Sequence, residues 1–185
     1  PVPSGSFQQG VCGQTVTESV LLTEDIGPCP GDADVLVVGA NDVVVDGNGF
    51  KLIGTGGAGT RGVVVDGVHD VTVQRFLVAG GFEHGIEVGA ATGVVVRQNV
   101  LFANDIGLAV GADASGLVAE LNVFSYNSVG AIACQGAGNS FADNLLLLNG
   151  AEPGSPLPGT QVQAVAGNLF AGNFWGNYWG VDDGS

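Results

Sequence analysis

Two short clusters of histidine and carboxylate side chains contain the residue types that could bind a metal ion. The first cluster is Asp66, His69 and Asp70, and the second is Glu83 and His84. Imidazole nitrogen combined with carboxylate oxygen is a ligand set that suits Zn²⁺ or Cu²⁺. The competing interpretation is that both histidines are solvated turn residues. We therefore predict no resident metal and keep these five residues as the metal candidates.

A second set of polar residues recurs at a nearly constant spacing. Arg75, Arg97 and Glu120 follow one another at almost equal intervals, and Asp46 and Gln74 come before them. If residues at this spacing share one face, they form a polar stripe that could hold an acidic sugar such as a uronate. An arginine–glutamate pair on a solvated face is more commonly a weak surface salt bridge, so the stripe by itself predicts no reaction.

The spacing of asparagines indicates which elements would position these side chains. One phrase occurs in four near-copies, NVLFAN, NVFSYN, NLLLLN and NLFAGN. The phrases open at Asn99, Asn122, Asn144 and Asn168 and close at Asn104, Asn127, Asn149 and Asn173. A nearly fixed period of this size is typical of a repeat architecture.

Apolar residues form columns when the units are aligned on these asparagines. Two of the columns are Val45, Val73, Val96, Ala119, Phe141, Val165 and Val63, Ile86, Leu108, Ile132. Apolar residues two positions apart indicate strands, and frequent glycine argues against helix. Three short strands in every ~23 residues predict one coil of a parallel β-helix.

The eight asparagines are predicted to be structural. Strands in neighbouring coils lie about 4.8 Å apart, so an asparagine at one corner of a coil can donate a hydrogen bond to its equivalent in the next coil. Identical side chains stack into such ladders in cross-β assemblies. We expect one ladder from the opening asparagines and a second from the closing ones.

The chain divides into one domain with covered ends. Residues 1–34 are expected to be an N-terminal cap, 35–149 the β-helix coils, 150–160 an inserted proline-rich loop, and 161–185 the last coil with an aromatic tail. The tail residues Phe174, Trp175, Tyr178 and Trp179 are a candidate association surface, because the end of a solenoid exposes unpaired strand edges.

Cysteine placement indicates the cellular compartment. Cys12 and Cys29 both lie in the cap, before the repeats begin, and we predict a disulfide between them. Zinc is the rival interpretation, but no histidine or further cysteine lies nearby. Cys134 falls in an inward column and is predicted to be buried. A disulfide favours a secreted protein, either extracellular or at the cell surface, with the periplasm as an alternative.

The charge balance excludes several partners. The chain has 4 basic and 18 acidic residues, for a formal charge of −14. Nucleic acid would need the opposite sign, and anionic membrane surfaces are disfavoured for the same reason. No apolar run approaches the roughly 18 residues that a membrane span requires. We predict neither nucleic-acid binding nor membrane insertion.

The phrase DVVVDGNGFKLIGTG at residues 42–56, followed by the NxxxxN coils, resembles the right-handed parallel β-helix proteins of the pectate-lyase-like superfamily. The tail phrase GNFWGNYWG resembles that of the periplasmic copper-protein-like branch. The resemblance implies an all-β, single-domain, right-handed parallel β-helix of about six coils. It also implies a groove that often holds polysaccharide. In an enzyme of this kind Arg75, Arg97 and Glu120 would be the catalytic residues, with calcium as cofactor in a lyase or epimerase reaction.

Three functions from different classes follow, in the order in which the sequence favours them. The first is an extracellular structural module without catalysis, which associates with itself end to end or as a filament. The second is a polysaccharide-binding or carbohydrate-active protein. The third is a periplasmic metal-handling protein, in which the tail lends no ligand because it has no Cys, Met or His.

Overall fold

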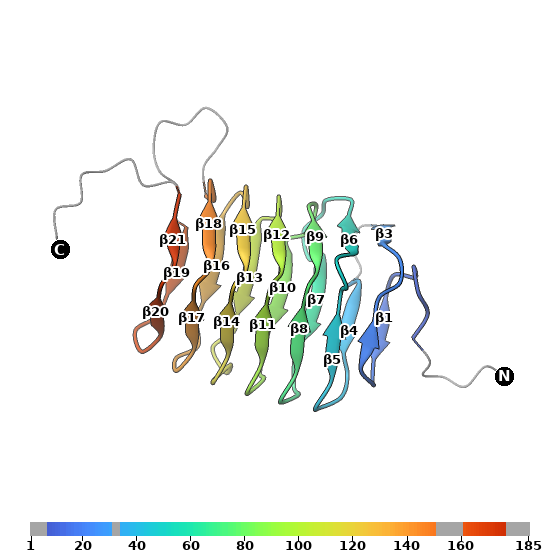
Figure 1. Ribbon diagram of the computed structural model, residues 1–185, viewed down its shortest axis with the longest axis horizontal. Coiled ribbons are helices and arrows are strands. Elements are labelled where there is room, and N and C mark those ends of the chain that lie inside the picture. Colours follow the sequence, from blue (N-terminus) through green and yellow to red (C-terminus); the bar gives the residue numbers. More distant parts are fainter. Residues whose placement is uncertain (1–6, 31–33, 151–160, 177–185) are drawn as a thin grey trace.

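The computed structural model describes residues 7–30, 34–150 and 161–176, and within them the chain forms 21 strands and no helix. The strands make three parallel sheets of seven, and each coil of the chain contributes one strand to each sheet. Figure 1 shows the coils stacked along the long axis from the N-terminal to the C-terminal end. The predicted all-β parallel β-helix of about six coils is therefore confirmed.

Each sheet has its strands in chain order. Sheet A contains β1 (Gln14–Val16), β4 (Leu36–Val38), β7 (Arg61–Val65), β10 (His84–Val88), β13 (Ile106–Val110), β16 (Gly130–Cys134) and β19 (Val162–Ala164). Sheet B contains β2 (Val20–Leu21), β5 (Val44–Asp46), β8 (Thr72–Gln74), β11 (Val95–Arg97), β14 (Val118–Glu120), β17 (Ser140–Ala142) and β20 (Leu169–Ala171). Sheet C contains β3 (Ile26–Cys29), β6 (Lys51–Gly54), β9 (Leu77–Ala79), β12 (Val100–Phe102), β15 (Val123–Ser125), β18 (Leu145–Leu147) and β21 (Phe174–Trp175).

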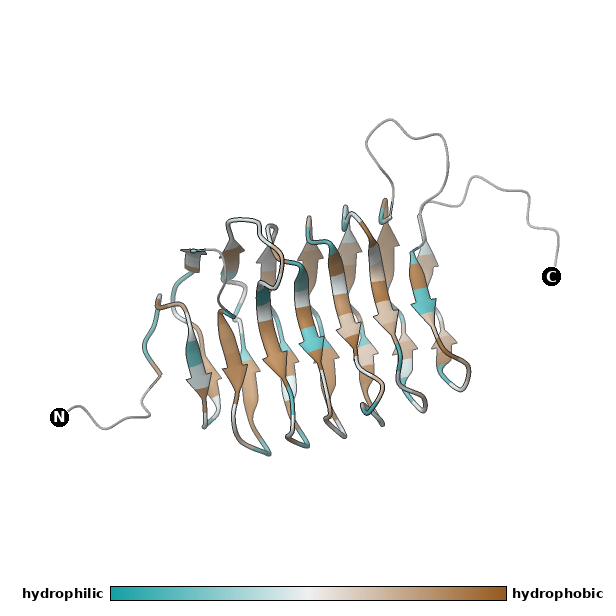
Figure 2. Cartoon of the chain, turned by 180° about the vertical axis from the view of Figure 1, so that it is seen from behind, coloured by the Kyte–Doolittle hydropathy of each residue, from teal (hydrophilic) through white to brown (hydrophobic). Residues whose placement is uncertain are grey.

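The core is a narrow column of apolar side chains enclosed by the three sheets. Val73 pairs with Val45 on one side and Val96 on the other, and all three are fully buried. Ile86 lies between Val63 and Leu108 in the same way. Figure 2 shows hydrophobic residues concentrated on the strands. Alternate residues of each strand thus build one continuous interior.

The last coil has a different register from the one predicted. Phe141 pairs with Phe170, not with Val165, and the two rings stack with centroids 4.7 Å apart. The prediction was wrong because the phrase NLFAGN was aligned with the sheet C phrases. NLFAGN instead repeats NSFADN (139–144), the phrase that contains the sheet B strand of the preceding coil. Residues 151–160 lengthen the coil between the two phrases and so disturb the regular spacing.

The same shift makes two predicted ladder positions wrong, those of Asn168 after Asn144 and of Asn173 after Asn149. Asn99 donates its backbone N–H to Asn122 Oδ1 at 3.0 Å, Asn122 to Asn144 at 2.9 Å, and Asn144 to Asn173 at 3.0 Å. Asn168 does not follow Asn144, since it accepts instead from the backbone N–H of Asn139 at 2.9 Å. A separate ladder runs through Asn104, Asn127, Asn149 and Gln161.

A disulfide holds the first coil. The predicted Cys12–Cys29 bond is present, and Cys12 and Phe7 pack against the hydrophobic core. The strands β1, β2 and β3 lie within the segment expected to be a cap and are the first strands of the three sheets. In the described residues no helix is long and apolar enough to cross a membrane.

Candidate functional site

One metal candidate brings two turns of neighbouring coils together. Asp42 lies between β4 and β5, and His69 and Asp70 lie between β7 and β8. One ligand atom from each of the three side chains lies within 4.8 Å of the others, and all three residues are exposed. His69 Nδ1 is 2.9 Å from Asp70 Oδ2. The arrangement offers one imidazole and two carboxylates to a single ion.

The backbone fixes the positions of these three side chains. The Asp42 N–H donates to the His69 carbonyl at 3.1 Å, and the His69 N–H donates to Asn41 Oδ1 at 3.0 Å. Asp70 continues the contact into the next coil by donating to the Thr92 carbonyl at 3.0 Å. The two turns are therefore held side by side by ladder hydrogen bonds.

The structure divides the predicted histidine clusters differently. Asp66 was expected beside His69 but is not part of this group of three, and its carboxylate accepts a hydrogen bond from the Ala90 N–H at 2.6 Å. Asp42 was not predicted, because it lies in the coil before that of His69 and sequence proximity does not reveal it. The aligned columns were the signal that could have pointed to it, because Asp42 and Asp70 each lie three residues before a member of the column that contains Val45 and Val73. Glu83 is separated from His84, since its carboxylate accepts from the Gly59 N–H.

His84 belongs to a chain of four side chains that spans three coils of sheet A. His84 Nδ1 is 2.6 Å from Glu87 Oε2, and Glu87 Oε1 is 2.7 Å from Arg61 Nη1. Arg61 also binds Asp34 through two parallel contacts of 2.7 and 2.8 Å. About a fifth to a third of each side chain is exposed. Paired, part-buried charges of this kind hold one another in a defined geometry.

These contacts set the ionisation of two members of the chain. Burial by itself raises the pKa of the Glu87 carboxyl, but hydrogen bonds from His84 and Arg61 and the charge of Arg61 outweigh it, and the pKa is lowered. The hydrogen bond to Asp34 is the largest effect on Arg61 and, with the contact to Glu87, raises the pKa of the guanidinium despite burial. Glu87 is therefore a carboxylate at neutral pH.

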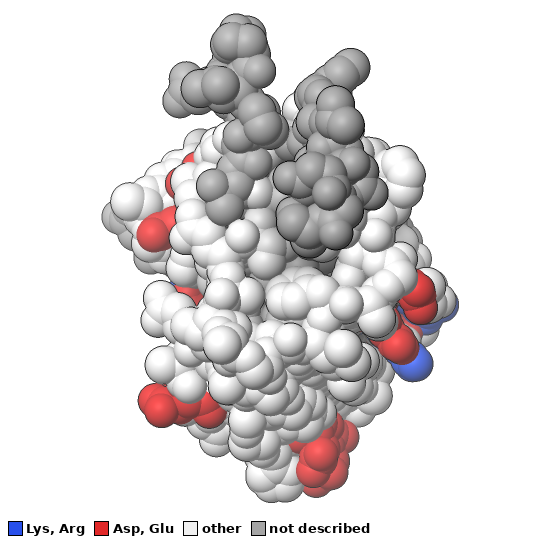
Figure 3. All heavy atoms as spheres, turned by 90° about the vertical axis from the view of Figure 1, so that its left-hand side faces the viewer, with Lys and Arg blue, Asp and Glu red and all other residues white. Residues whose placement is uncertain are grey.

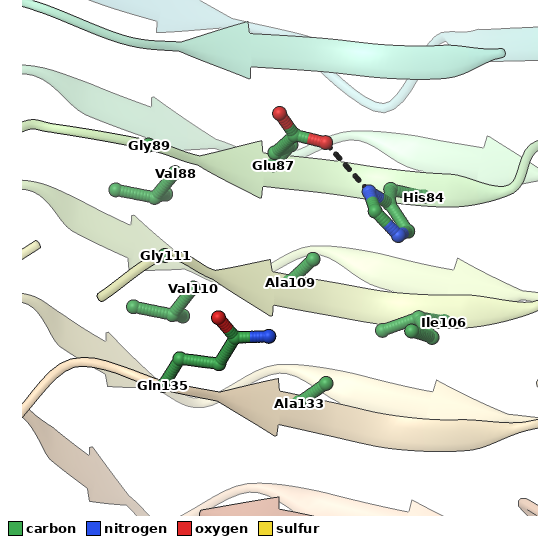
Figure 4. A pocket seen from close by; sticks show the side chains of 10 residues that line it. All are labelled: His84, Glu87, Val88, Gly89, Ile106, Ala109, Val110, Gly111, Ala133 and Gln135. Carbon is green, nitrogen blue, oxygen red and sulfur yellow. Dashed lines mark hydrogen bonds and ion pairs between the residues drawn. The ribbon is translucent and has the colours of Figure 1, made fainter. Parts of the chain in front are cut away.

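A hollow of about 170 Å³ lies over sheet A next to this chain. Figure 4 shows the residues that line it: His84, Glu87, Val88, Gly89, Ile106, Ala109, Val110, Gly111, Ala133 and Gln135. Its floor is the outward face of β13 and β16, where the small side chains Ala109 and Ala133 lie in register. The hollow is apolar except for His84 and Glu87 at one side and Gln135 at the other.

The polar stripe lies on the outward face of sheet B. Asp46, Gln74, Arg97 and Glu120 occupy one register column. Arg75 Nε donates to Asp46 Oδ1 at 2.8 Å, and Arg97 Nε donates to Gln74 Oε1 at 2.9 Å. These hydrogen bonds link neighbouring coils, so a structural role accounts for Arg75 and Arg97. A catalytic role for Arg75, Arg97 and Glu120 stays a prediction.

The aromatic association surface lies only partly in the described residues. Phe174 and Trp175 form β21 and expose 62% and 40% of their surface, respectively. Tyr178 and Trp179 lie outside the described residues, as does the loop predicted at 150–160 except for Gly150.

Comparison with protein families gives one match that spans most of the chain. The family model described as periplasmic copper-binding protein (NosD) matches residues 8–179. No curated protein and no solved structure matches the chain.

Proposed function

Since the chain belongs to the NosD family of periplasmic copper-binding proteins, we propose that it is an extracytoplasmic β-helix protein that binds Cu²⁺ at Asp42, His69 and Asp70. The family supports a periplasmic or extracellular location, in agreement with the disulfide of the first coil. Retention at the cell surface remains a prediction.

The available donors fit Cu²⁺ and not Cu⁺. Cu⁺ prefers thiolate and thioether ligands, whereas Cu²⁺ accepts imidazole and carboxylate. The chain contains no methionine, and two of its three cysteines form the disulfide. The third, Cys134, is buried, and its burial raises the pKa of the thiol, which disfavours the thiolate that a metal needs.

The observation that carries the proposal is the convergence of Asp42 with His69 and Asp70. Asp42 comes from one coil and the other two residues come from the next, so the fold and not the local sequence creates the site. His69 exposes 50% of its side chain and Asp70 exposes 64%. An ion at this site would keep contact with solvent, which suits a protein that takes up copper and passes it on.

Binding of Cu²⁺ to purified protein tests the proposal. Isothermal titration should show one specific equivalent, and electron paramagnetic resonance should show nitrogen coordination. His69→Ala should weaken binding by at least about tenfold, since loss of even a supporting contact to a metal costs roughly 10- to 100-fold. His84→Ala is the matched control, because it removes the chain's other histidine and should leave affinity unchanged.

Two results would contradict the proposal. One is binding that survives His69→Ala, and the other is binding that is lost with His84→Ala. Asp42→Asn gives a further check, because this residue is far from His69 in sequence and reaches the site only through the stacking of coils. Its substitution should weaken copper binding without altering the thermal unfolding of the metal-free protein.

A structural, self-associating role is the second candidate. Among the described residues β19, β20 and β21 are the outermost strands of the three sheets at one end. Leu169 and Phe174 in these strands expose 61% and 62% of their surface. Figure 3 views the molecule from this end and shows an uncharged surface with acidic residues toward its edge. Unpaired strand edges with exposed apolar side chains favour association with another chain.

A further inference from the structure

The second histidine has the geometry of an oriented general base. The carboxylate of Glu87 can only accept a hydrogen bond, so at 2.6 Å it receives the proton on His84 Nδ1. In the neutral imidazole the lone pair is then on Nε2. Figure 4 shows this nitrogen on the side of the ring away from Glu87, toward β13.

The rest of the four-residue chain keeps this orientation fixed. Arg61 holds the second oxygen of Glu87 at 2.7 Å, and Asp34 holds Arg61 through two contacts. Glu87 therefore has little freedom to release His84 Nδ1. A base held by an acceptor, which is held in turn by a further group, is the arrangement that general-base catalysis needs.

The hollow beside His84 can accept a small, mainly apolar molecule. Ala109, on its floor, is 8% exposed, and Ile106 and Val110 add further apolar surface. Gln135 supplies a polar amide at the far side. His84 begins β10 and Gln135 follows the end of β16, so the two lie at opposite corners of the hollow, with two strand spacings of about 10 Å in all between their strands. The Gln135 side chain extends back over the hollow toward Ala109 (Figure 4), so a bound ester that lies across the hollow faces the imidazole on one side and the amide on the other.

We propose that His84 activates water for the hydrolysis of small uncharged esters bound in this hollow. His84 Nε2 takes a proton from water while the water oxygen bonds to the acyl carbon and the carbonyl electron pair moves onto its oxygen. The Gln135 amide N–H donates to that oxyanion. The bond from the acyl carbon to the alkoxy oxygen then breaks, and His84 returns the proton to the leaving alkoxide. The products are a carboxylic acid and an alcohol.

Size and charge define the substrate class. A hollow of about 170 Å³ has room for a short acyl group, whereas most of a long chain would lie outside it. The formal charge of −14 and the carboxylate of Glu87 disfavour anionic esters. His84 is the catalytic residue in this scheme, and Glu87 and Arg61 are positioning residues.

Hydrolysis of p-nitrophenyl acetate, measured with EDTA present to keep copper out, tests this inference separately from the copper site. His84→Gln should lower kcat by about 100-fold. Glu87→Gln should lower kcat with little change in KM, and Ala109→Phe should raise KM by filling the hollow. The wild-type rate should fall in D₂O, and this isotope effect should vanish in His84→Gln. His69→Gln is the matched control and should keep the full rate.

Several outcomes would overturn the inference. They are a wild-type rate no higher than that of an equal concentration of free imidazole, a His84→Gln rate equal to wild type, or equal rates for acetate and dodecanoate esters. Circular dichroism and thermal unfolding of every variant show whether it is folded. If His84→Gln fails to fold, Ala109→Phe and the isotope effect of the wild type still decide the question.

Discussion

Asp46 organises the outward face of sheet B, although it is 7% exposed and carries a charge. Its carboxylate accepts from Arg75 Nε at 2.8 Å, from Gln74 Nε2 at 2.7 Å and from the Asn48 N–H at 2.8 Å. A buried charge is tolerated when its acceptor positions are filled in this way. Arg75 reaches Asp46 because its φ of 57° turns the chain at the corner that follows β8.

Asp46 also makes stability depend on pH. Burial by itself raises the pKa of this carboxyl, but the hydrogen bonds from Arg75, Gln74 and Asn48 and the charge of Arg75 outweigh it, and the pKa is lowered. The folded state therefore binds this proton less readily than the unfolded state. The stabilisation is present above the unfolded value of about 3.9 and is lost as pH falls through the folded pKa.

Asp46→Asn tests this contribution. We expect the substitution to reduce the free energy of unfolding at pH 7 by about 2 kcal/mol, because hydrogen bonds to a charged group contribute roughly 1.5–3 kcal/mol. The loss should be smaller at pH 3, below the unfolded pKa of about 3.9, because the unfolded wild-type chain then binds the proton that the folded state binds less readily. Urea unfolding at both pH values measures it. Asp113→Asn, at an exposed aspartate, is the control, and an equal loss at pH 7 in this variant would contradict the account.

At the scale of the element, each sheet B corner of the later coils consists of a left-handed residue followed by a ladder asparagine. The left-handed residues are Gln98, Leu121, Asp143 and Gly172, which precede Asn99, Asn122, Asn144 and Asn173. The left-handed residue turns the backbone. The side chain of the asparagine that follows then forms hydrogen bonds with backbone groups at the corner of the neighbouring coil. Both residues are needed because a buried corner would otherwise leave polar backbone groups unpaired.

Asn122→Ala tests the energetic role of the ladder. Asn122 Oδ1 accepts from the Asn99 N–H at 3.0 Å, and its Nδ2 donates to the Val96 carbonyl at 2.8 Å. The substitution leaves the buried Asn99 N–H without its acceptor, which costs about 1–3 kcal/mol, and also removes the amide donor to the Val96 carbonyl, so we expect a loss of about 3 kcal/mol. Chemical denaturation measures it.

Asn168→Ala is the comparison variant. This asparagine lies at the outermost coil described and is only half-buried, so water can replace its contacts and the loss should be below about 1 kcal/mol. Equal losses of unfolding free energy for Asn122→Ala and Asn168→Ala would contradict the account, in which a ladder asparagine contributes more to stability when it is buried.

The sequence predicted the elements wherever the corners have constant length. The column Val63, Ile86, Leu108 and Ile132 was correct because every turn between these strands preserves the register. Asn168 was misplaced because the NxxxxN phrase fits two different corners and an insertion precedes it. Asp42 was missed as a site residue because the turns that hold it and His69 are more than one common period apart in the sequence.

At the scale of the whole molecule, charge and exposed strand edges act against each other. The formal charge of −14 makes molecules repel, whereas the exposed apolar residues of the last coil favour contact. Salt screens the repulsion within about 8–10 Å at physiological strength. Association of this protein with itself should therefore increase with ionic strength.

Leu169→Glu tests self-association through the last coil. Leu169 is 61% exposed on an outermost strand, whereas Leu121 is 52% exposed at a corner in the middle of the solenoid. Wild-type protein should form dimers or larger species in high salt by light scattering, and Leu169→Glu should abolish them. Leu121→Glu is the matched control and should associate like wild type. A wild-type monomer at every salt concentration would contradict the self-associating role.

The most direct test of the copper assignment is a crystal structure of the protein with Cu²⁺, with anomalous scattering measured at the copper absorption edge. The account predicts one strong peak in contact with a His69 ring nitrogen and with a carboxylate oxygen of Asp42 or Asp70. A peak at His84 with none at His69, or no ordered copper at all, would contradict it.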